Sequence, residues 1–192
     1  ETPARARLAD PRIGVFFGGK YLYEEDERGV EVRYYTHRWR LEPKDLTAFR
    51  QGRLTEPVQP IVFYVDDAFP ESWKPHVKAG IEEWQAAFEK IGFKNAIVAR
   101  DFPADDPAFD PENLAYSCVR YSPSPVANAM GPSWTDPRTG EIINASVYVY
   151  HNLVAMVLDW RFLHTAPADP SVRKVKLDEE TFGDCMRYVI GH

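Results

Sequence analysis

The chain has 192 residues, of which 44% are hydrophobic and 27% charged, the balance of a globular protein with a sizeable core. Its length suits one domain, or one domain with an appendage. A net charge of −6 without a basic run argues against a nucleic-acid partner, and no apolar stretch approaches the roughly 20 residues that span a bilayer. Two cysteines, Cys118 and Cys185, are too few for a disulfide scaffold; a single bridge and two buried thiols both fit the sequence.

The first third of the chain predicts a short β-rich region. Residues 12–17 and 30–35 are β-prone, and the acidic turn at 24–29 would join them as a hairpin. Gly18-Gly19 is expected to end the first of these strands. Residues 42–59 have the mixed, proline-containing composition of a loop, so we place a domain boundary near residue 59.

The middle of the chain predicts a strand–helix–strand unit. Residues 61–65 form a continuous apolar run, as in a strand buried on both faces, and residues 96–99 form a second one. Between them, a single apolar stripe at helical spacing predicts one long helix: Val77, Ile81, Trp84, Phe88 and Ile91. Ser72 is the expected N-cap, and Gly92 is the expected stop.

Three further segments have the alternation or apolar periodicity of regular structure: strands at 116–121 and 142–150, and a helix at 153–163. The turn that precedes the second strand is predicted at 136–141. The acidic segment 101–113 is either a solvated loop or a calcium site, and its spacing does not match an EF-hand. Residues 126–132 are either an edge strand or a plain loop, since prolines flank them.

A final helix is predicted from the apolar face formed by four residues: Phe182, Cys185, Met186 and Val189. Acidic residues at 178–180 favour its start, and only Gly191 and His192 follow its apolar face. In zinc proteases a His-Glu-x-x-His helix presents two imidazoles on one face, so His192 is either a zinc ligand or an ordinary terminal residue.

The other four histidines have structural interpretations. His37 and His76 are expected at the surface, and His164 is expected to interact with the negative end of a helix dipole. His151, which ends a strand, is expected to be a structural hydrogen bonder.

Nearly the whole chain, in order, resembles a family of large bacterial zinc-dependent metalloproteases of the metzincin type. The most specific segments are SPVANAMGPS (124–133) and DPRTGEII (136–143). The other segments are residues 9–14, 38–41, 56–65, 80–88 and 92–97. The resemblance implies an α+β or α/β fold, a zincin-like N-terminal subdomain with a twisted, mixed five-stranded sheet, a long backing helix and an active-site helix. Residues 1–59, with their β-hairpin, would end an upstream accessory region, and residues 60–192 would be an incomplete catalytic domain.

The same resemblance implies a zinc-dependent endopeptidase as the parent protein. The family's motif continues as His-Glu-x-Gly-His, so His192 would be the first zinc ligand and the catalytic Glu would follow it directly. We therefore expect an internal fragment that contains no catalytic residue, binds zinc weakly or not at all, and is inactive alone. The full protein would bind zinc and be exported to the periplasm, cell surface or medium.

The resemblance also implies a substrate site at a sheet edge. A peptide would add by main-chain hydrogen bonds to a strand formed by Val126, Ala127, Asn128, Ala129, Met130 and Gly131. The alternative function is a zincin-like scaffold that binds peptide or polysaccharide without catalysis.

Overall fold

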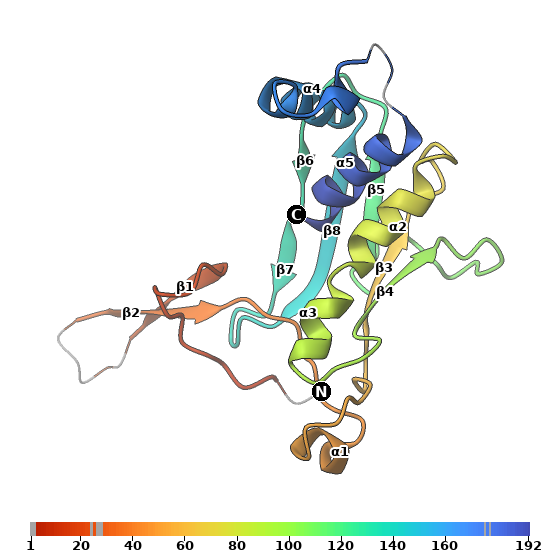
Figure 1. The fold of residues 1–192 in the computed structure, drawn as a ribbon. Coiled ribbons are helices and arrows are strands. Elements are labelled where there is room, and N and C mark those ends of the chain that lie inside the picture. The colour runs from red at the N-terminus through yellow and green to blue at the C-terminus, as the bar shows by residue number, and fades with distance from the viewer. Residues whose placement is uncertain (1–2, 24, 26–28, 175, 177) are drawn as a thin grey trace. The chain divides into compact units, whose positions relative to one another are not determined.

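The computed structural model describes residues 3–23, 25, 29–174, 176 and 178–192 (Figure 1). The chain divides into two compact units, Glu1–Arg40 with Ser133–Ala145, and Leu41–Pro132 with Ser146–His192. The first unit thus ends at Arg40 instead of near residue 59. Residues that follow Arg40 belong to the second unit because Thr55 forms a bridge with Phe93.

The first unit contains an antiparallel hairpin of β1 (Phe17–Leu22) and β2 (Glu31–Thr36). The hairpin and its second strand confirm the prediction, but the first strand was placed wrongly at 12–17. Gly18 and Gly19 lie inside β1 and do not end it. A Cβ atom at Gly19 would lie 3.1 Å from the Tyr34 ring, so the small residue gives this ring room on β2. The predicted acidic turn lies partly outside the described residues.

A second antiparallel pair in this unit joins β7 (Ser133–Thr135) to the first part of β8 (Ile142–Tyr150). The predicted turn between them is confirmed: Gly140 has φ +75°, and its N–H donates to the Asp136 carbonyl oxygen. Arg38 N–H donates to the Gly140 carbonyl, which ties this pair to the N-terminal segment. The bounds of β8 match the prediction, whereas β7 was missed.

The second unit is built on a mixed sheet with the order β4-β3-β5-β8-β6. The strands not yet given are β3 (Ile61–Val65), β4 (Ile97–Asp101), β5 (Ser117–Ser122) and β6 (Ala129–Met130). Neighbours among β4, β3, β5 and β8 run parallel, and β6 runs antiparallel to β8 at the edge. With β7 the sheet has six strands instead of the five expected, and the fold is mixed α/β.

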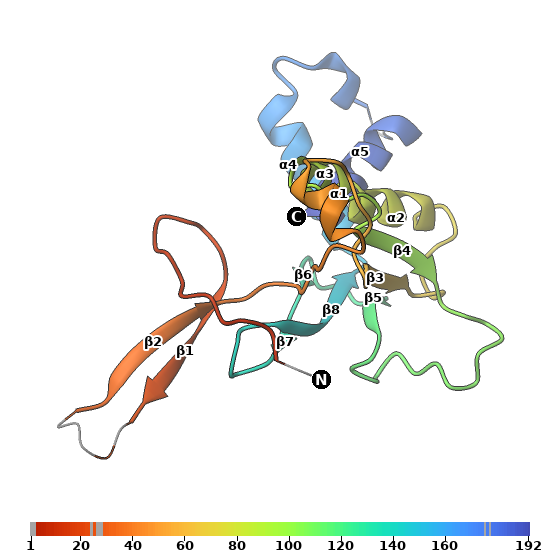
Figure 2. The same ribbon diagram turned by 90° about the horizontal axis from the view of Figure 1, so that it is seen from below.

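The helices of this unit lie on one face of the sheet (Figure 2). They are α1 (Leu46–Arg50), α2 (Lys74–Glu82), α3 (Gln85–Lys90), α4 (Leu153–Thr165) and α5 (Glu179–Gly191), with a 3₁₀ turn at Pro170–Val172. The helix α1 lies in the segment predicted as a loop. It begins where the Asp45 carboxylate accepts a hydrogen bond from Ala48 N–H, a local signal that composition alone does not reveal.

The single long helix predicted between β3 and β4 is two helices, α2 and α3. Val77 and Ile81 are buried as predicted, but Trp84 and Ile91 are 50% and 59% exposed, so the stripe is wrong in its second half. The N-cap is Trp73, without a side-chain cap, instead of Ser72. Gly92, with φ +98°, confirms the predicted stop.

The core of the second unit buries apolar side chains from strands and helices together, including Val65, Val119 and Met186. Cys118 and Cys185 are both buried and both free, which resolves the open pairing question in favour of two thiols. Burial raises the pKa of the Cys118 thiol to about 11. Such a thiol is protonated at neutral pH and behaves as a small apolar group.

Candidate functional site

The start of α5 is fixed by its first turn, as the sequence predicted. The Asp178 carboxylate accepts a hydrogen bond of 2.9 Å from Thr181 N–H. This bond, with the Thr181 hydroxyl and Lys174, lowers the pKa of Asp178 to about 2. Glu179 and Glu180 occupy the first turn, where the helix dipole favours negative charge.

Two glycines allow α5 to lie close against α2. A Cβ atom at Gly183 would lie 2.5 Å from the His76 ring, and one at Gly80 would lie 2.9 Å from the Ile190 Cβ. His76 also contacts the Phe182 ring edge-on, with ring centroids 6.0 Å apart. His76 is therefore half-buried between two helices and is not the surface residue expected.

The last turn of α5 is held from the side. The indole Nε1–H of Trp84 donates to the Gly191 carbonyl oxygen at 2.7 Å, and Arg187 pairs with Glu83 at 3.7 Å. His192 is the C-cap of the helix, and its N–H donates to the Tyr188 carbonyl oxygen. The His192 side chain is exposed, so its imidazole is accessible to a ligand.

The predicted edge strand is present but short. Only Ala129 and Met130 have strand structure, and they pair with Val149 and Tyr148 of β8. The residues Val126, Ala127, Asn128, Met130 and Gly131 are exposed, and Ala129 is half-buried. The C-terminal end of α5 lies on the helix-covered side of the sheet, over the part that holds β6 and β7 (Figures 1 and 2).

The ladder shows which backbone groups of the edge face outward. Tyr150 N–H donates to the Asn128 carbonyl, and Ser146 N–H donates to the Pro132 carbonyl. The backbone N–H and C=O groups of the even-numbered residues therefore point toward β8. In an antiparallel ladder this alternation turns the backbone groups of the residues between them away from the partner. The N–H and C=O groups of Ala129 and Gly131 therefore face away from β8.

The donor set for a metal is incomplete within the described part of the chain. It contains no group of three or more His, Cys, Asp or Glu side chains that could hold a metal ion. Catalytic zinc usually takes three protein ligands. His192, an exposed imidazole at a helix end, fits as one of them, and the others would have to come from outside these residues.

A second cluster lies at the carboxyl ends of the parallel strands and was mostly missed by the sequence analysis. His151 Nδ1 and the Tyr121 hydroxyl are 2.6 Å apart, which confirms His151 as a structural hydrogen bonder. The Trp73 ring stacks on His151, with centroids 5.2 Å apart. Asp66 accepts from Tyr121 N–H at 3.2 Å and from Arg120 Nε at 3.3 Å. Asp66, Tyr121 and His151 share a position at or near the carboxyl end of a parallel strand. Ligand sites of open sheets form there, so this position is the sequence signal by which the cluster could have been found.

Comparison with known proteins assigns a family match only to the start of the chain. A family described as "Domain of unknown function (DUF5117)" matches residues 1–44. No curated protein and no solved structure matches the chain. The family match does not extend to β6 or α5, so the candidate site rests on sequence and geometry. None of the helices among the described residues is long and apolar enough to cross a bilayer.

Proposed function

We propose that the chain is the N-terminal part of the catalytic domain of a metzincin-type zinc endopeptidase, and that His192 is the first zinc ligand. The observation that carries the proposal is the exposed His192 at the end of α5, on the helix-covered side of a sheet whose antiparallel edge strand is β6. The sequence resemblance to such proteases supports the same assignment. The zincin-like identity of the fold is part of this proposal.

The geometry of α5 explains how the site would be completed. A helix places residues four apart on one face, so a second histidine four positions after His192 would share its face. The glutamate expected directly after His192 would act as the general base. Zinc, when bound, would supply a Lewis acid and an activated water. Within this chain, α2 and Trp84 hold the helix end and His192 provides the first imidazole.

The edge strand would hold the substrate. An extended peptide could pair with the outward-facing backbone groups of Ala129 and Gly131, as in strand addition to a sheet edge. Their small side chains leave room for a close backbone approach: a Cβ atom at Gly131 would meet only Val147, at 3.8 Å. The substrate class is therefore peptide or protein. The enzyme would be exported, as such proteases usually are.

A second function is a zincin-like scaffold that binds peptide or polysaccharide without catalysis, at the exposed edge formed by β6. Such a scaffold would keep the edge strand and lack the ligands that the enzyme requires.

The test compares two histidine variants of the longer protein that includes the residues after His192. We expect His192→Ala to lose bound zinc and chelator-sensitive casein cleavage. His164→Ala, an exposed histidine in the last turn of α4, should retain both. Zinc is measured by elemental analysis. Zinc retained by His192→Ala, or cleavage that chelator does not inhibit, would contradict the proposal. Peptide binding without zinc or cleavage would support the scaffold.

A further inference from the structure

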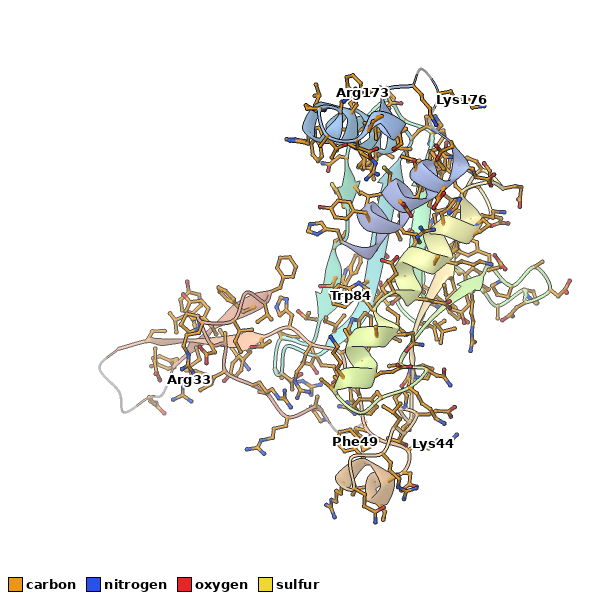
Figure 3. The ribbon with its side chains drawn as sticks, viewed as in Figure 1. Arg33, Lys44, Phe49, Trp84, Arg173 and Lys176 are labelled. Carbon is orange, nitrogen blue, oxygen red and sulfur yellow. The ribbon has the colours of Figure 1, made fainter. Side chains whose placement is uncertain are left out.

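Trp84 contacts the backbone of α5 directly before the proposed zinc ligand. It lies between α2 and α3 and is labelled in Figure 3. Its Nε1–H donates to the carbonyl oxygen of Gly191 at 2.7 Å, and Gly191 precedes His192. The indole therefore holds the peptide unit from which the His192 backbone continues.

Gly191 is the residue at which such a restraint has the largest effect. Glycine has the widest choice of backbone conformations, so a glycine before a ligand leaves the direction of that ligand poorly fixed. A side chain is not readily accommodated there, because a Cβ atom at Gly191 would lie 3.3 Å from the Gly80 carbonyl oxygen. Gly191 packs against α2, and its backbone therefore needs a restraint from outside α5 to fix its conformation.

The hydrogen bond is compatible with a longer helix. The last four carbonyl groups of a helix lack intrahelical partners, and the Trp84 indole satisfies one of them. If the helix continues, the Gly191 carbonyl has a second lone pair for the helical N–H. The nearby Arg187–Glu83 pair is half-exposed at 3.7 Å, so screening by solvent leaves it a weaker restraint than the indole.

We propose that Trp84 is a positioning residue for His192, which fixes the last turn of α5 and so the direction of the imidazole. This inference rests on the proposed function. Because Trp84 is half-exposed, its contribution to the core is small and its hydrogen bond is the main contact that a substitution removes.

The experiment measures zinc affinity of the longer protein by competition with a chelator. Trp84→Phe keeps an aromatic ring and removes the donor. We expect it to weaken zinc binding about tenfold or more, as loss of groups that orient metal ligands does. Trp160→Phe is the matched control, since Trp160 is 51% exposed on α4. Equal zinc affinity in the two variants would overturn the inference. Absence of zinc from the unsubstituted protein would instead remove the proposed function, and this inference with it.

A second measurement uses the 192-residue chain without metal. It tests the Trp84–Gly191 hydrogen bond directly, and so applies even if Trp84→Phe does not fold. The chain has five tryptophans, so its indole N–H signals can be followed individually by NMR. We expect the Trp84 indole proton to exchange with solvent more slowly than that of Trp160, because only the former is donated to a helix carbonyl in the structure. Equal exchange rates would mean that the hydrogen bond is absent, and would overturn the inference.

Discussion

A Cβ atom added to Gly80 would lie 2.9 Å from the Cβ of Ile190, closer than side-chain carbons pack. The same atom would lie 2.9 Å from the carbonyl oxygen of Arg187, which is backbone and cannot rotate away. The absence of a side chain at Gly80 is therefore what lets α2 and α5 lie against each other. This contact fixes the last turns of α5 against α2.

We expect Gly80→Ala to lower the free energy of unfolding. Overpacking costs about 1–3 kcal/mol, and the gain of about 1 kcal/mol in helix propensity offsets part of it. The net loss should be up to about 2 kcal/mol, measured by urea denaturation. Gly131→Ala is the control, because its Cβ would make an ordinary contact of 3.8 Å. Equal stability of the two variants would show that α2 and α5 are less closely packed than described.

The N-cap of α5 makes stability depend on acid pH. The pKa of Asp178 is about 2 in the folded protein, below its ordinary value of 3.8. A carboxylate with a lowered pKa stabilises the fold above its unfolded pKa, and this contribution is lost as the pH falls through the folded value. We expect Asp178→Ala to lower Tm at pH 7, and the difference from the parent chain to shrink between about pH 4 and pH 2.

Glu180→Ala is the control for this pH series. Glu180 lies in the same turn but is not the N-cap. Its effect on Tm at pH 7 should be the smaller of the two. A difference between Asp178→Ala and the parent chain that stays constant down to pH 2 would contradict the linkage.

The two cysteines give a direct check on the core. Cys118 is 0% and Cys185 5% exposed, and burial raises the pKa of both thiols. Because the thiolate is the reactive form, the folded chain should react slowly with a thiol reagent at pH 8. In denaturant we expect two thiols per chain to react at once. No reaction in denaturant without reductant would reveal a disulfide.

The elements that could be predicted from sequence are those whose signal is local. The strand β8 and the turn before it follow from a long β-prone run and from residues that favour tight turns, and α5 follows from its acidic start and apolar face. Trp84 was assigned wrongly because its place is set by a tertiary contact, the hydrogen bond to Gly191, and not by helical periodicity. Likewise, Gly19 lies within a strand because Tyr34 on the neighbouring strand fills the space above it.

The same distinction between local signals and tertiary contacts applies to the candidate site. Residues 126–131 were assigned to an edge strand from their small side chains and the family resemblance, while the flanking prolines left a plain loop open; β6 lies at the sheet edge. The strand is shorter than expected, since only Ala129 and Met130 hold strand structure. The contact of Tyr121 with His151 brings together residues 30 positions apart. No local pattern encodes such a pair, because it depends on which strands become neighbours.

The alternation along β6 predicts that two neighbouring proline substitutions affect different properties, one thermal stability and the other substrate binding. Met130 lies in the ladder with Tyr148, so Met130→Pro should remove a hydrogen bond to β8 and lower stability. The Ala129 N–H faces away from β8 and is bonded to the Asn128 side chain at 2.8 Å. Ala129→Pro should therefore change Tm little, but remove a donor that the proposed substrate would use. In the longer protein we expect it to raise KM for a peptide substrate, with Met130→Pro losing thermal stability instead. An unchanged KM in Ala129→Pro would place the substrate elsewhere than on this edge.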